Sequence, residues 1–184
     1  MKSIDGKVFF SESANSGLIE IRAQIPKWQE TLLFIWVLAW TFCGLVVIVN
    51  FFGEYTREEK LMMLVYILFW IYFEYKAVYA FLWKKWGKEF IKIDEEGIRY
   101  KRDINSFGKS SKYFKENIKK FSAIDVKEKS FISSYYQSFW MVGNESIQFE
   151  HLGKKVGIAL GCDNKQRDEV LKFLKYQQKK LHLK

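Results

Sequence analysis

Residues 31–52 form a run of 22 residues without a single Asp, Glu, Lys, Arg or His. As a helix that rises 1.5 Å per residue, this run reaches about 33 Å and covers a hydrocarbon core of about 30 Å. A second apolar run of 23 residues follows at 61–83, after a short polar connection at 53–60. Because lipid offers the backbone no hydrogen-bonding partner, both runs are predicted to be helices, and residues 28–86 are predicted to form a two-helix transmembrane hairpin.

The lysine and arginine residues near the two spans predict the orientation of the hairpin, because cationic loops remain on the cytoplasmic side. Residues 84–103 contain seven of them, against two in residues 11–30 and two in residues 53–60. Two spans place both termini on one side of the membrane, and the seven cations decide which side. We expect a multi-pass protein of the bacterial inner (cytoplasmic) membrane, with both termini in the cytoplasm and residues 53–60 outside.

Outside the hairpin, apolar residues that alternate with polar ones predict short strands. One strand is expected at about 18–25, within an N-terminal segment at 1–27, and Pro26 ends it. About seven more are expected after Trp86, at 90–93, 98–104, 112–115, 118–126, 137–142, 146–152 and 156–160. Asp163 and Gln166 then form a capping-box signature, which predicts an amphipathic helix that reaches about Lys180.

Three segments carry a resemblance to a group of known proteins: FLWKKWGKEFIKIDEEGIRYKR, SKYFKENIKKF and SIQFEHLGKKVGIALGCDNKQRDEVLKFL. Together with the apolar hairpin they resemble small bacterial membrane proteins that carry a pleckstrin-homology-like domain behind two transmembrane helices. The resemblance covers nearly the whole chain from about Leu18. It implies that residues 87–184 form a cytoplasmic α+β domain, a bent antiparallel sheet of about seven strands closed by a C-terminal helix. Members of this group mostly lack an assigned activity, so the resemblance implies no ligand.

The sequence contains none of the P-loop, GxSxG, GxGxxG and HExxH motifs that mark common catalytic and cofactor sites. His151 alternates in phase with Ile147 and Phe149, which favours a strand residue over a catalytic base. Cys43 and Cys162 are far apart in the sequence, and a packing role is expected for each. We therefore predict a protein that is not an enzyme and that uses no cofactor or metal.

Glu74 and Lys76 are charged residues inside the second span, where an ionised side chain costs about 2.5 to 3.5 kcal/mol. Counted back from Lys84, Glu74 lies about 15 Å deep in the hydrocarbon layer. Thr41 of the first span lies at the same depth in an antiparallel hairpin, and its hydroxyl group is therefore predicted to donate a hydrogen bond to Glu74. Lys76 is about 200° around the helix from Glu74, so the two side chains face different surroundings.

Three interpretations of these two charges remain open. Glu74 and Lys76 contact a helix of a partner protein, or Glu74 exchanges a proton in a transport or energy-coupling assembly. In the third, the bilayer boundary lies nearer Tyr75, and the Lys76 side chain extends to the interface.

The positive charge of the chain is concentrated after the second span. Residues 84–184 contain 23 Lys and Arg against 13 Asp and Glu, whereas residues 1–83 contain seven against eight. Lys84, Lys85 and Lys88 are predicted to face anionic lipid, which attracts each nearby cation by about 1 kcal/mol. Lys109, Lys112, Lys115, Lys119 and Lys120 extend this surface if their loops face the membrane, and otherwise form a solvated face. Nucleic acid is not an expected partner, because aromatic residues do not interleave with these lysines.

Residues 130–140 are apolar and aromatic but poor in charge. Tyr135, Tyr136, Phe139 and Trp140 form either core and strand edge or an exposed groove that accepts a peptide by strand addition.

The function expected from the sequence is that of a non-enzymatic, membrane-anchored interaction or scaffold module within a larger inner-membrane complex. Its expected partners are membrane lipid and either another membrane protein or further copies of the same chain. The alternative is a subunit of an oligomeric channel, transporter or membrane-perturbing effector that uses Glu74 in the bilayer.

Overall fold

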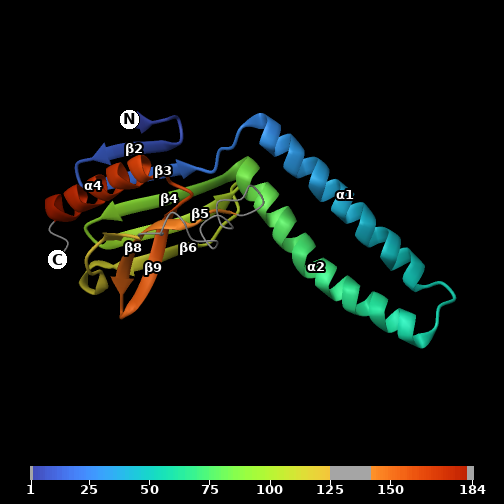
Figure 1. The fold of residues 1–184 in the computed structure, drawn as a ribbon. Coiled ribbons are helices and arrows are strands. Elements are labelled where there is room, and N and C mark those ends of the chain that lie inside the picture. The colour runs from blue at the N-terminus through green and yellow to red at the C-terminus, as the bar shows by residue number, and fades with distance from the viewer. Residues whose placement is uncertain (1, 125–141, 182–184) are drawn as a thin grey trace.

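The computed structural model describes residues 2–124 and 142–181. Two long helices, α1 (Lys27–Phe51) and α2 (Arg57–Trp86), form an antiparallel hairpin (Figure 1). Both are long and apolar enough to cross a membrane. Each begins four residues before its apolar run. Pro26 precedes α1 in an extended conformation, and Thr56 starts α2 with a capping box in which its side chain accepts a hydrogen bond from Glu59 N.

The larger sheet contains six antiparallel strands in the order β1 (Lys2–Ile4), β2 (Val8–Ser13), β3 (Ser16–Arg22), β4 (Gly87–Asp94), β5 (Gly97–Ile104) and β6 (Ser110–Phe114). The strands β3 and β4 are neighbours in this sheet, paired from Ser16↔Asp94 to Arg22↔Lys88. The helical hairpin is therefore an insertion between two paired strands. The predicted strand at 18–25 exists as β3, which begins and ends earlier, whereas β1 and β2 were not predicted.

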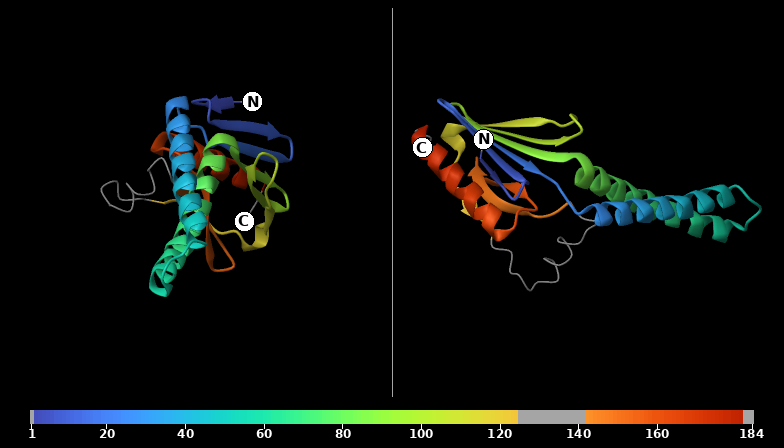
Figure 2. Two further views of the ribbon diagram at one scale, coloured as in Figure 1. Left: turned by 90° about the vertical axis from the view of Figure 1, so that its right-hand side faces the viewer. Right: turned by 90° about the horizontal axis from the view of Figure 1, so that it is seen from above.

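The helix α2 passes directly into β4, because Trp86 is the last helical residue and Gly87 the first residue of the strand. A Cβ atom on Gly87 would lie 2.3 Å from the carbonyl oxygen of Trp83, so the close approach at this junction requires glycine. The other side of the hairpin is tied to the same point, since Ala23 N donates to Gly87 O at 3.0 Å. Figure 2 shows the hairpin projecting from one end of the sheets.

A second antiparallel sheet contains β7 (Ser122–Ala123), β8 (Glu145–His151) and β9 (Lys154–Leu160). The C-terminal helix α4 (Asn164–Lys180) starts with the predicted capping box of Asp163 and Gln166. A short 3-10 helix, η1 (Lys115–Asn117), follows β6. One core joins the two sheets to α4, and its fully buried members include Ile19, Ile91, Ile147, Ile158, Val170 and Leu174.

The coarse architecture expected from the sequence is thus confirmed: two long apolar helices, antiparallel sheets and a C-terminal helix. The strand expected at 118–126 is largely absent from the described residues, since only Ser122–Ala123 form a strand there. Ile118 forms an isolated bridge with His151 instead. The strand expected at 137–142 lies outside the described residues apart from Val142, which belongs to no strand.

Candidate functional site in the helical hairpin and at its root

A constant antiparallel register aligns the two helices of the hairpin. The rings of Phe34 and Phe81 lie 5.5 Å apart between centroids. Seven residues further along α1 and seven residues back along α2, Thr41 Oγ1 lies 2.7 Å from Glu74 Oε1. The predicted contact between Thr41 and Glu74 is therefore present. The contact between Thr41 and Glu74 lies next to a small apolar cluster of Leu33, Val37, Ala77 and Phe81.

The hydroxyl group of Thr41 contacts both helices of the hairpin. Thr41 Oγ1 lies 2.8 Å from Val37 O on α1 and donates to Glu74 Oε1 on α2 at 2.7 Å. A hydroxyl group has one proton, so the two acceptor oxygens share it. The contact gives the carboxyl group of Glu74 a polar partner inside an apolar helix pair, where a polar group without a partner is costly.

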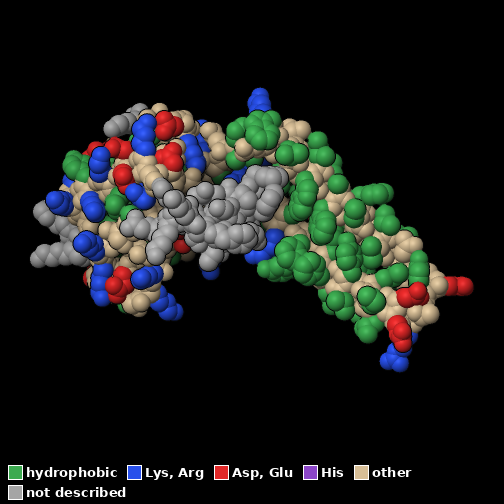
Figure 3. Space-filling model, viewed as in Figure 1, with side chains coloured by type: hydrophobic (Ala, Val, Ile, Leu, Met, Phe, Trp, Pro, Cys, Tyr) green, Lys and Arg blue, Asp and Glu red, His purple; other side chains and the backbone are tan. Residues whose placement is uncertain are grey.

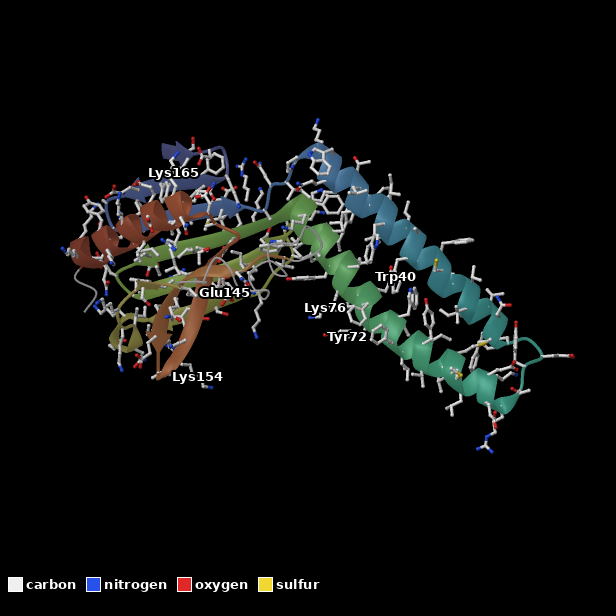
Figure 4. All side chains as sticks on the ribbon, viewed as in Figure 1. Trp40, Tyr72, Lys76, Glu145, Lys154 and Lys165 are labelled. Carbon is white, nitrogen blue, oxygen red and sulfur yellow. The ribbon has the colours of Figure 1, made fainter. Side chains whose placement is uncertain are left out.

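The second carboxyl oxygen of Glu74, Oε2, is buried and has no hydrogen-bond partner in the described part of the chain. Lys76 does not supply one. Its side chain is exposed and points away from α1, and its Nζ atom lies 5.7 Å from the ring centroid of Tyr72 on the outer face of α2 (Figure 4). Glu74 therefore faces the inside of the hairpin and Lys76 faces outward, as their spacing along the helix predicts.

Gly44 of α1 and Trp70 of α2 pack closely against each other. A Cβ atom on Gly44 would lie 1.9 Å from Cε2 of Trp70, so the indole ring occupies the space that a side chain would fill. The Nε1 group of Trp70 also donates to the backbone oxygen of Trp40 at 3.1 Å. A glycine at a helix interface lets the two backbones approach closely, and the aromatic ring of Trp70 occupies the space beside it.

The three lysines predicted to face lipid have different surroundings at the root of the hairpin. Lys85 Nζ lies 3.7 Å from Glu30 Oε1, and Lys88 Nζ lies 3.9 Å from Glu20 Oε1. Both line the same hollow between the end of α2 and the larger sheet. Lys84 is half-buried and is not among the residues that line it. The structure therefore brings two of the three together.

A buried carboxylate that the sequence analysis did not single out connects the two sheets. Glu89 of β4 is fully buried and accepts hydrogen bonds from Ala159 N at 2.9 Å and Leu160 N at 2.8 Å, at the end of β9. Burial raises the pKa of Glu89, although these hydrogen bonds oppose the shift. Ala159 has a φ of 61°, a left-handed conformation that is uncommon for alanine. Glu89 thus fixes the bend at the end of β9.

A chain of polar contacts continues from Glu89 toward the surface. Arg102 Nε donates to the hydroxyl oxygen of Tyr100 at 2.6 Å, and Arg102 Nη2 lies 2.6 Å from Glu145 Oε1. Burial and the nearby carboxylate of Glu89 raise the pKa of Tyr100. The alternation of Glu89 with Ile91 and Ile93 was the available signal that this carboxyl group faces the core.

Other candidate residues from the sequence have no described place in a site. Tyr135, Tyr136, Phe139 and Trp140 lie outside the described residues. His151 packs its ring edge-on to Tyr113 with centroids 5.0 Å apart. Within residues 2–124 and 142–181, no group of three His, Cys, Asp or Glu side chains lies where it could hold a metal ion.

Comparison of the chain with protein-family models, with curated proteins and with solved structures found no match. The functional argument therefore rests on the hairpin, on its root and on the way both join the sheets.

Proposed function

We propose that the chain is a non-enzymatic interaction or scaffold module, anchored in the bacterial inner membrane by α1 and α2, with both termini in the cytoplasm. The observation that carries this proposal is the insertion of the hairpin between the paired strands β3 and β4. Since α2 continues into β4 without a loop, the membrane anchor also sets the orientation of the sheets. An anchor of this kind presents one fixed face of the sheets to a partner at the membrane.

The finer fold assignment belongs to the same proposal. The antiparallel strands and the C-terminal helix α4, which packs on the shared core, are the features that support a pleckstrin-homology-like domain. On this assignment, β1, β2 and β3 belong to that domain together with the strands after the hairpin.

The topology can be tested with single cysteines in a chain that carries Cys43→Ala and Cys162→Ala. Glu54→Cys, in the turn between α1 and α2, should react with an impermeant thiol reagent added to intact cells. Glu96→Cys, in the turn between β4 and β5, is the matched control and should react only after lysis. The opposite pattern would place the sheets outside and contradict the proposed location.

The interaction role predicts a partner protein that co-purifies with the full chain from native membranes. Glu74→Gln should reduce the yield of that partner if Glu74 contacts it within the bilayer. Glu54→Gln, the same change at an exposed position outside the apolar run, is the control. Equal yield of the partner with both variants would show that Glu74 does not contribute to the interface with it.

A second candidate function is a subunit of an oligomeric channel, transporter or membrane-perturbing effector. The observation that favours this function is the burial of Glu74 Oε2 without a hydrogen-bond partner in the described residues. This oxygen is available to exchange a proton or to bind a polar group of another helix. One hairpin cannot enclose a pore, so this function requires several copies or other subunits. A monodisperse monomer, purified in mild detergent without other proteins, would contradict it.

A further inference from the structure

A hollow of about 370 Å³ lies where the hairpin meets the larger sheet. Its lining combines three cationic side chains with polar and aromatic groups: Arg22, Lys85, Lys88, Trp86, Asp103 and Ser106. These residues come from the end of β3, the last turn of α2, the start of β4, the end of β5 and the turn that follows it. Figure 3 shows apolar side chains along the hairpin and Lys and Arg side chains over the sheet region beside it.

The cations of this hollow keep hydrogen-bond donors for a ligand. Among the described residues, the carboxylates nearest to Lys85 and Lys88 lie at 3.7 Å and 3.9 Å, beyond hydrogen-bond distance, so these carboxylates leave the ammonium donors available. Arg22 uses Nε to bind Glu20 at 2.8 Å. Asp103 is the one acidic residue in the lining, and Lys101 pairs with it. The hollow therefore favours an anion.

A rigid turn with an exposed aromatic tip borders the hollow. Asn105 and Ser106 have φ angles of 48° and 75°, and two backbone hydrogen bonds of 2.8 and 2.9 Å join Ile104 and Phe107. Positive φ angles at both central residues are the geometry of a two-residue hairpin turn. Ser106 N also donates to Asp103 Oδ2 at 3.0 Å. The turn holds the Phe107 side chain in solvent, 81% exposed.

The sheet register places this turn at the end of the sheet nearest the hairpin. Ile104, the last residue of β5, pairs with Gly87, the residue that follows α2. Figures 1 and 2 both show the turn between β5 and β6 beside the start of the hairpin.

The length of α2 gives the depth of the hollow in a bilayer. The helix has 30 residues. At 1.5 Å per residue it spans about 45 Å, the thickness of a hydrocarbon core together with both headgroup layers. With Leu61 at one edge of the hydrocarbon, Lys85 and Trp86 lie at headgroup depth on the other side. Trp28 at the start of α1 is 65% exposed at the same end, where indole rings are enriched in membrane proteins.

We propose that this hollow binds the phosphate headgroup of an anionic phospholipid of the membrane that the hairpin spans, and that Phe107 inserts beside it into the boundary between headgroups and acyl chains. Phosphate oxygens accept charge-assisted hydrogen bonds from Lys85, Lys88 and Arg22. The site rests on the proposed membrane anchoring. It adds a second attachment of the sheet to the bilayer, separate from the hairpin.

Lipid retention tests the headgroup site. The full chain is reconstituted in nanodiscs that contain phosphatidylglycerol in phosphatidylcholine, extracted gently, and analysed by native mass spectrometry. The parent chain should retain phosphatidylglycerol. The affinity of the double variant Lys85→Gln/Lys88→Gln for this lipid should be lower by a factor of about ten or more. Lys154→Gln/Lys155→Gln is the matched control with the same loss of charge. These lysines are exposed at the start of β9, and Lys154 lies away from the hairpin (Figure 4).

The outcome of this experiment separates the possible sources of the anion. Equal loss of lipid in both double variants would show that lipid retention depends only on the net charge of the chain, and would contradict a lipid site in the hollow. A large excess of inorganic phosphate should leave phosphatidylglycerol bound, since the acyl chains and Phe107 contribute. Displacement by inorganic phosphate would instead identify a site for free phosphate and contradict the lipid assignment.

Depth measurements separate this inference from the proposed anchoring. A nitroxide label is attached in turn to Phe107→Cys, Glu96→Cys and Val65→Cys in the chain without Cys43 and Cys162. The depth of each label is measured as the ratio of its collision rate with oxygen to its collision rate with a water-soluble nickel complex. Position 107 should lie at the bilayer boundary, position 96 in water and position 65 in hydrocarbon. If 65 reports hydrocarbon and 107 matches 96, the docking of the turn is wrong and the anchoring stands. If 65 reports water, both proposals fail.

Discussion

The hydroxyl group of Thr41 lies 2.7 Å from Glu74 Oε1 on the opposite helix of the hairpin. The same hydroxyl group lies 2.8 Å from Val37 O on its own helix. Glutamine keeps a side-chain oxygen that can accept the hydrogen bond from Thr41. Glu74→Gln should therefore leave the stability of the hairpin nearly unchanged, whereas Thr41→Val should lower its free energy of unfolding by about 0.6 to 2 kcal/mol.

These energies can be measured by unfolding in mixed micelles, with Thr31→Val as the control. Thr31 donates to Lys27 O on its own helix at 3.0 Å, a contact that does not join the two helices, so its substitution should cost less. Equal costs for Thr41→Val and Thr31→Val would contradict a stabilising contact between Thr41 and Glu74.

Gly44 should tolerate no larger residue while Trp70 is present. Because a Cβ atom would lie 1.9 Å from the indole ring, Gly44→Ala must push the helices apart or displace the ring. We expect a loss of about 1 to 3 kcal/mol in the free energy of hairpin unfolding. Trp70→Ala should remove most of this effect in a double-mutant cycle. An additive cycle, or an equal loss for Ala39→Val on the exposed face of α1, would contradict the packing contact.

The hairpin was the most predictable part of the fold, because lipid leaves an apolar segment of this length one hydrogen-bonded conformation. Its register was predictable as well. Two helices joined by a short turn must align residues at equal depth, and this alignment indicated the pair Thr41 and Glu74 before their contact was known.

The sheet was less predictable, because its pairing is not local. The strand β3 follows a clear alternation, but nothing in it indicates that its partner β4 lies beyond the whole hairpin. The strands β1 and β2 carry weak patterns of three and six residues. Glu89 alternates with buried isoleucines, yet its partners are backbone N–H groups of β9, which follow only from the packing of one sheet on the other. The hollow at the root likewise joins three distant segments.

Glu89 should make the stability of the sheets depend on pH. Its pKa is raised in the folded chain above the ordinary value of 4.5, because burial disfavours the charged form. The folded state then binds more protons than the unfolded state, so the contribution of Glu89 is fully present below about pH 4.5 and declines as the pH rises toward the folded pKa. Denaturant unfolding across this range should show that decline in the parent chain.

Glu89→Gln is the variant that isolates this effect. The amide does not titrate, so the difference in stability between the parent chain and Glu89→Gln should shrink as the pH rises. The variant should be less stable at low pH, because its NH₂ group cannot accept the second backbone N–H of β9. A difference that grows with pH would mean that the two hydrogen bonds outweigh burial and that the folded pKa is lowered.

The strand before the hairpin should stabilise the sheets after it. Ile19 of β3 is fully buried in the core that also contains Phe149 and Ile158 of the second sheet. Ile19→Ala should lower the free energy of unfolding by about 2 to 5 kcal/mol, with Ser11→Ala, at an exposed position of β2, as the control. Because the core is shared, amide hydrogen exchange should accelerate in β8 and β9 as well as in β3. Acceleration confined to β1, β2 and β3 would show that the N-terminal strands fold as a separate unit, with the sheets after the hairpin stable on their own.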